Sequence, residues 1–126
     1  MTALLRAGEP FRMHGGAMSR FKIECDALTE ADCIAAAAWL LPLVHPYSSV
    51  EAVASTGPVA EWLGDAFARH LSPGGPVLIV DDVLTSGASM EDQRAARSDV
   101  KGAVIFARGP CPSWVEAMFT LNERAR

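Results

Sequence analysis

Two adjacent carboxylates and a loop of small residues lie together in residues 77–89, which read VLIVDDVLTSGAS. Asp81 and Asp82 end an apolar run that suits a buried strand, and the Thr/Ser/Gly segment after them precedes a helical pattern. Amide groups at a helix N-terminus bind anions, and a glycine at position 87 leaves no Cβ to obstruct a phosphate. We therefore predict a phosphate loop formed by Val83, Leu84, Thr85, Ser86, Gly87, Ala88 and Ser89.

The two carboxylates need partners, because they repel each other and also repel a phosphate bound beside them. The vicinal diol of a ribose offers two hydroxyl donors to Asp81 and Asp82. A nearby Mg²⁺ would relieve the remaining repulsion, since it prefers hard oxygen ligands. This combination predicts a site for a ribose 5-phosphate. The alternative is a capped strand-to-helix turn with solvated acids.

The same segment resembles the 5-phosphoribosyl-1-pyrophosphate (PRPP) binding motif of type I phosphoribosyltransferases. The resemblance implies that Asp81 and Asp82 hold the ribose 2′ and 3′ hydroxyls at the catalytic centre, while the loop binds the 5′-phosphate. It also implies an enzyme that transfers the phosphoribosyl group of PRPP to a nitrogenous base, with Mg²⁺ as cofactor and pyrophosphate as leaving group.

Two weaker similarities accompany this motif. Ala54, Ser55, Thr56 and Gly57 stand where the family places its pyrophosphate loop, although a helix N-cap at Thr56 with Pro58 in the first turn explains them equally well. Residues 11–26 are similar to the N-terminal hairpin of orotate phosphoribosyltransferases, which helps to form a hood over the base. By that similarity Ser19, Phe21 and Lys22 approach the base or a partner subunit, whereas the alternative makes Phe21 a core residue and Lys22 a solvated one.

The chain departs from the family between Gly57 and Val77, where 19 residues suffice only for one helix and a turn. The family usually inserts a further strand and a mobile loop there, which closes over PRPP and excludes water. Without that lid, hydrolysis competes with transfer. A second hypothesis is therefore a non-catalytic phosphoribosyl-binding or regulatory module. Arg20, Arg108 or a partner subunit are candidates for supplying the missing cations.

Apolar runs alternating with helical patterns predict a three-layer α/β/α fold with a short parallel sheet and an N-terminal β-hairpin. We expect strands at 11–13, 21–25, 50–54, 77–80 and 103–107, and helices at 29–43, 59–71 and 89–97. Residues 111–126 fit either a helical face or an edge strand. The 126 residues form one domain, with the hairpin at 11–26, the α/β core at 29–107 and a C-terminal segment at 108–126.

The amino-acid composition restricts the kinds of partner that we expect this protein to bind. A net charge of −4 argues against a broad surface for nucleic acid or anionic membranes, and no apolar run is long enough to span a bilayer. Three cysteines without CxxC spacing indicate free thiols in a reducing compartment and argue against a zinc site, so we expect a cytoplasmic protein with no direct metal ligands. The exposed edges of a small sheet favour a homodimer.

Overall fold

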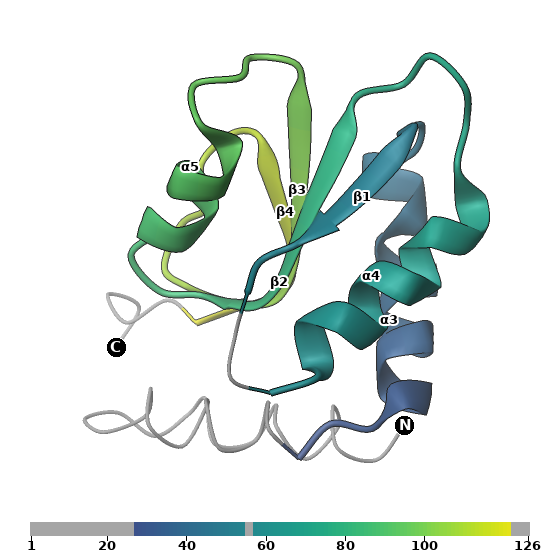
Figure 1. Ribbon diagram of the computed structural model, residues 1–126. Helices are drawn as coiled ribbons and strands as arrows, with labels where there is room; N and C mark the ends of the chain where they lie inside the picture. Colours follow the sequence, from purple (N-terminus) through teal and green to yellow (C-terminus); the bar gives the residue numbers. More distant parts are fainter. Residues whose placement is uncertain (1–26, 55–56, 122–126) are drawn as a thin grey trace.

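The computed structural model describes residues 27–54 and 57–121 (Figure 1). The expected hairpin at 11–26 lies outside these residues. The described elements are α3 (Glu30–Val44), β1 (Ser49–Ala52), α4 (Val59–Phe67), the 3₁₀ helix η2 (Ala68–His70), β2 (Val77–Leu84), α5 (Ala88–Arg94), β3 (Val100–Arg108) and β4 (Val115–Leu121).

The strands form one parallel sheet in the order β1-β2-β3-β4, which confirms the predicted α/β/α fold. Leu78 and Val80 pack into the hydrophobic cluster that contains residues of α3 and α4, whereas Ile79 between them packs with Met90 of α5. The α3–α4 layer and α5 therefore cover opposite faces of the sheet (Figure 1). Helices on both faces explain why β2 and β3 are apolar without interruption along most of their length.

The first described helix begins and ends where the sequence predicts. Thr29 is its N-cap: the Thr29 side chain accepts from the Asp32 amide, and the Asp32 carboxylate accepts from the Thr29 amide, both at 3.1 Å. This reciprocal pair is a capping box. Helix α3 ends at Val44, just before Pro46.

Most helices and strands differ from their expected bounds by a few residues: β1 is Ser49–Ala52, β3 is Val100–Arg108, and α4 ends at Phe67. β2 runs on to Leu84, because Asp81 pairs with Val104 and Val83 with Phe106 in β3. Helix α5 stops at Arg94 rather than at residue 97, because Ala95 takes a left-handed conformation with φ of 55°. The C-terminal segment, left open above, forms the parallel edge strand β4.

The connections between neighbouring strands do not all have the same handedness. Every connection steps in the same direction across the sheet. The segment between β3 and β4 packs Cys111 and Trp114 into the α5-side cluster, so it crosses the same face as α5, whereas α4 crosses the other face. The β1–α4–β2 connection is therefore opposite in hand to the other two. Since right-handed crossovers are the rule, α4 forms the left-handed exception.

Among the described residues, no helix is both long and apolar enough to cross a bilayer.

Candidate functional site

The site predicted from the sequence lies at the carboxyl edge of the sheet, where β1 ends beside the middle of β2. The last pair of these strands is Ala52 with Val80, and the Val53 amide still donates to the Val80 carbonyl at 2.9 Å. Beyond that point β2 continues for four residues to Leu84. Asp81 and Asp82 therefore begin just where β1 stops, beside the start of the predicted pyrophosphate loop.

Both carboxylates are buried, with 7% of each residue exposed. Each is held by the backbone next to it: Asp81 Oδ1 accepts the Asp82 amide at 2.8 Å, and Asp82 Oδ1 accepts the Val83 amide at 2.8 Å. These bonds orient the carboxylates on a rigid strand. A rigid strand is a better platform for binding ribose hydroxyls than a mobile loop.

Asp82 lies near Cys33 of α3. Burial, followed by the negative charges of Asp32, Asp82 and Glu30, raises the pKa of the Cys33 thiol to about 12. The thiol is therefore protonated at neutral pH. The Cys33 Sγ–H donates weakly to the Val59 carbonyl at 3.8 Å. Because the thiolate is the nucleophilic form of cysteine, this residue packs the core and does no nucleophilic chemistry.

The predicted phosphate loop divides into two parts. Val83 and Leu84 belong to β2, and their side chains pack in the core, Val83 on the α3–α4 side and Leu84 on the α5 side. The loop itself is confined to the exposed Thr85, Ser86, Ala88 and Ser89 around the half-buried Gly87.

Gly87 is the turning point of the loop and the N-cap of α5. Its φ of 88° lies in the left-handed region that favours glycine. A Cβ added there would meet no heavy atom within 4 Å, so the space beside the glycine is open. The Ala88 amide donates to Ser86 Oγ at 3.2 Å. A phosphate in this loop would have to compete with that exposed hydroxyl for the amide.

A cleft of about 580 Å³ opens at the end of β1 beside the start of α4. Its lining comprises Ala52, Val53, Ala54, Gly57, Pro58, Ala60 and Glu61. Ala54 and Gly57 of the predicted pyrophosphate loop thus face this cleft, while Ser55 and Thr56 lie outside the described residues. The Glu61 carboxylate in the lining disfavours an anion unless a cation accompanies it.

The start of α4 corrects one expectation. The N-cap is Pro58, without a side-chain hydrogen bond, and the helix begins at Val59. The alternative of a Thr56 N-cap with Pro58 in the first turn is therefore wrong. The side chain of the N-cap residue Pro58 makes no hydrogen bond to the first turn of α4.

The remaining predicted residues are placed as follows. Arg108 ends β3 and is exposed at the same edge of the sheet, because its neighbour Ala107 pairs with Leu84. Ser19, Arg20, Phe21 and Lys22 lie outside the described residues. Within 27–54 and 57–121, no group of three or more His, Cys, Asp or Glu side chains could hold a metal ion.

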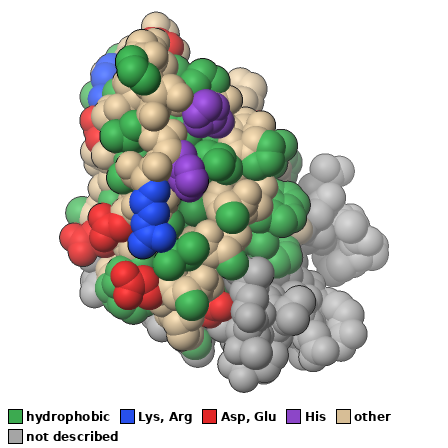
Figure 2. Space-filling view, turned by 90° about the vertical axis from the view of Figure 1, so that its right-hand side faces the viewer, with side chains coloured by type: hydrophobic (Ala, Val, Ile, Leu, Met, Phe, Trp, Pro, Cys, Tyr) green, Lys and Arg blue, Asp and Glu red, His purple; other side chains and the backbone are tan. Residues whose placement is uncertain are grey.

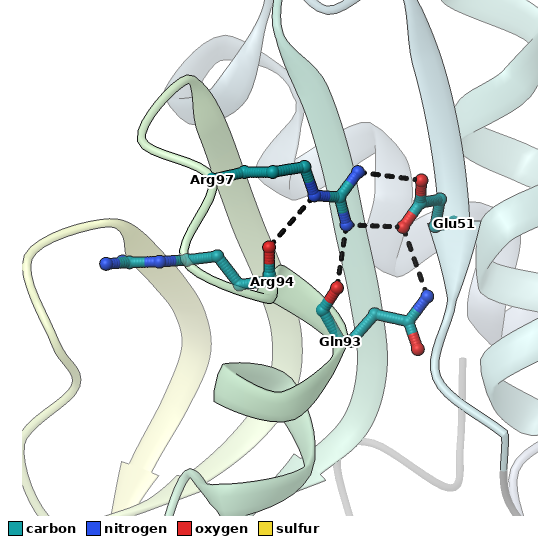
Figure 3. A network of polar contacts seen from close by, with 4 residues as sticks. All are labelled: Glu51, Gln93, Arg94 and Arg97. Carbon is teal, nitrogen blue, oxygen red and sulfur yellow. Dashed lines mark hydrogen bonds and ion pairs between the residues drawn. The ribbon is translucent and has the colours of Figure 1, made fainter.

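A polar network that sequence reasoning missed joins α5 to β1 (Figure 3). Arg97 donates to both carboxylate oxygens of Glu51, at 2.9 and 3.0 Å, and Gln93 donates to the same carboxylate at 3.1 Å. Arg97 also donates to the carbonyls of Gln93 and Arg94 at 2.7 and 2.9 Å. These hydrogen bonds connect the C-terminal end of α5 to β1, the strand that ends at the cleft. The one hint in the sequence is Glu51, a charged residue within a predicted strand.

Comparison with protein-family models and with curated proteins found no match to this chain. The function of the protein must therefore be inferred from the geometry of the carboxyl edge and from the motif of residues 77–89.

Proposed function

We propose that the protein binds PRPP at the carboxyl edge of β1 and β2 and transfers its phosphoribosyl group to a nitrogenous base, with release of pyrophosphate. Asp81 and Asp82 would accept hydrogen bonds from the ribose hydroxyls, and the loop of residues 85–89 would bind the 5′-phosphate. The main supporting observation is the pair of buried carboxylates in β2, two residues before a loop that turns at a positive-φ glycine.

The cleft beside α4 is suited to the pyrophosphate group of the same ligand. It lies at the end of β1, next to the strand that contains the carboxylates, and has Ala54 and Gly57 in its lining. Amides in the first turn of α4, which the Pro58 side chain does not cap, would attract phosphate oxygens. One PRPP molecule would then bridge the two loops that follow neighbouring parallel strands.

Mg²⁺ is best placed in this proposal as an ion that arrives with the substrate. The described residues offer no three-ligand site, and Mg²⁺ usually keeps several waters while binding substrate phosphates and one or two carboxylates. When bound to the pyrophosphate, it would lower the repulsion from Glu61 and stabilise the charge that develops on the leaving group.

A specific observation favours the second candidate, a phosphoribosyl-binding module without turnover. All residues between Pro58 and β2 belong to α4, η2 or a short turn. This part of the structure contains neither a further strand nor a long loop that could cover the ligand. Exclusion of water must then come from elsewhere, because an open site exposes the oxocarbenium-like transition state to hydrolysis.

Calorimetry with PRPP and Mg²⁺, followed by an assay of pyrophosphate release with a panel of bases, tests both candidates. The enzyme proposal predicts saturable binding and base-dependent release of pyrophosphate. Tight binding without release supports the binding module. Absence of binding contradicts both candidates.

We also propose a cytoplasmic location. Cys33 and Cys111 are free thiols, as is usual in reducing compartments.

A further inference from the structure

The outward face of α3 is apolar although it is exposed to solvent. Residues 33–44 of this helix are all apolar, so the side turned away from the sheet has no polar side chain along this stretch. Ile34, Trp39 and Leu43 are 39%, 52% and 49% exposed. A helix that is hydrophobic all round is normally buried on every side. The described residues of a single copy therefore leave α3 half covered.

A groove of about 410 Å³ continues this face at the C-terminal end of α3. It is lined by Leu41, Pro42, His45, His70 and Leu71. Figure 2 looks onto this side of the molecule and shows hydrophobic side chains around two histidines. The helix face and the groove are together called the α3 surface here, and exposed apolar surfaces of this kind mark sites of association.

Charge at the two ends of α3 indicates the partner. Glu30 is exposed at the N-terminal end, while at the C-terminal end Arg69 is exposed and the Lys101 ammonium donates to the Val44 and Pro46 carbonyls. If two copies pack their α3 helices antiparallel about a two-fold axis, Glu30 of each copy approaches the basic end of the other. A parallel arrangement would instead place like ends together.

The side chains between these ends permit close approach. Ala31, Ala35 and Ala38 share the outward side of α3 at helical spacing, and Ala31 and Ala38 are exposed. Small residues let two helix axes come near the short end of the usual 8–10 Å range. Trp39 and Leu43 would then flank the contact and supply most of the apolar area.

We propose that the α3 surface is the interface of a homodimer, in which two α3 helices pack antiparallel about a two-fold axis. The proposal does not depend on the function suggested above. It assigns a specific surface to self-association, because each copy supplies both the apolar face and the complementary charges.

The first test is sedimentation of the full chain over a range of concentrations. The wild type should dimerise, and Trp39→Glu with Leu43→Glu should weaken the dimer more than about a hundredfold, since four large apolar side chains are then replaced by charges at the contact. Both positions are about half exposed, so the monomer should keep its fold by circular dichroism. Ser113→Glu, with an exposed charge in the segment on the α5 face, is the control and should leave the dimer intact.

A charge exchange tests the antiparallel arrangement. Glu30→Lys alone and Arg69→Glu alone should each weaken the dimer, and the double variant should regain most of the wild-type affinity. A monomeric wild type at every concentration would overturn the proposal. So would a dimer that persists in the Trp39→Glu/Leu43→Glu variant, and failure of the double variant to recover would overturn the antiparallel arrangement.

Discussion

At the residue scale, the account depends on how Asp81 and Asp82 are held. Each carboxylate accepts the neighbouring backbone amide through Oδ1, which orients it on β2. An asparagine side chain offers the same carbonyl-type acceptor but has no charge. The role of these residues in folding can therefore be separated from their role in binding.

The double variant Asp81→Asn/Asp82→Asn should bind PRPP at least about tenfold more weakly, since hydrogen bonds to charged acceptors contribute about 1.5–3 kcal/mol each. Its melting temperature should stay near that of the wild type, because the local amide bonds remain. Isothermal calorimetry with PRPP and Mg²⁺ measures the first effect and calorimetric unfolding the second. Unchanged affinity would contradict the ribose assignment.

Gly87→Val should prevent phosphate binding for two reasons. A β-branched residue resists a φ of 88°, at a cost of about 1–3 kcal/mol, and its side chain would fill the open space beside the loop. Gly74 is a matched control: its φ is 83°, an added Cβ meets nothing within 4 Å, and it lies in the turn before β2, at the opposite edge of the sheet. Both variants should lose similar stability, and only Gly87→Val should lose PRPP binding by calorimetry. Loss of binding in both would count against a wrapped loop.

At the element scale, α5 is positioned from both ends. The loop of residues 85–87 precedes α5, and the Glu51–Arg97 network connects its C-terminal end to β1. The hydrogen bond from Arg97, with a smaller one from Gln93, lowers the pKa of Glu51 below its ordinary value of 4.5. A lowered pKa in the fold means that the Glu51 carboxylate stabilises the native state above pH 4.5. This contribution is lost as the pH falls through the lower, folded-state value.

We therefore expect Glu51→Gln to be less stable than the wild type at neutral pH, with the difference shrinking as the pH falls below about 4.5. Urea unfolding at a series of pH values measures this difference. Glu116→Gln, at an exposed position of β4, removes the same charge and serves as the control. A difference for Glu51→Gln that stays constant into acid would show that the ion pair adds no stability.

Two buried glycines distinguish the packing of the two layers. An added Cβ at Gly64 in α4 would make ordinary contacts of 3.5–3.6 Å, so Gly64→Ala should stabilise the fold by up to about 1 kcal/mol through helix propensity. At Gly102 in β3 the Cβ would lie 2.9 Å from Val115 and 3.0 Å from Met90 and Trp114.

Gly102→Ala should therefore destabilise the fold by about 1–3 kcal/mol, because side chains of α5 and β4 must shift to make room. Thermal unfolding of the Gly64→Ala and Gly102→Ala variants measures whether each substitution stabilises or destabilises the fold. Equal effects would show that the α5 layer is no more tightly packed against the sheet than the α4 layer.

Parts of this architecture follow from local sequence and parts do not. The capping box of α3, the apolar run of β2 and the glycine before α5 are each visible within a few neighbouring residues. The pairing of Glu51 with Arg97 joins positions 46 residues apart, so no local pattern could show it. The sequence also does not predict that α5 ends at Arg94, because Ala95 takes the left-handed conformation where glycine would be expected.

At the scale of the whole molecule, the left-handed β1–α4–β2 connection is the most unusual feature. The step from α4 to β2 is direct, and α4 lies on the face of the sheet opposite to α5. The sequence alone does not indicate the handedness of this connection. Between α4 and β2 no further segment is left that could close over this edge of the sheet.

The central claim is that the carboxyl end of β2 binds a sugar phosphate, and a crystal structure of the protein grown with PRPP and Mg²⁺ tests it most directly. The account predicts ribose density against Asp81 and Asp82, with the 5′-phosphate beside Gly87 and the Ala88 amide released from Ser86. Density for the ligand elsewhere, or a phosphate-free loop that keeps its Ser86–Ala88 bond while the ligand is bound, would contradict it.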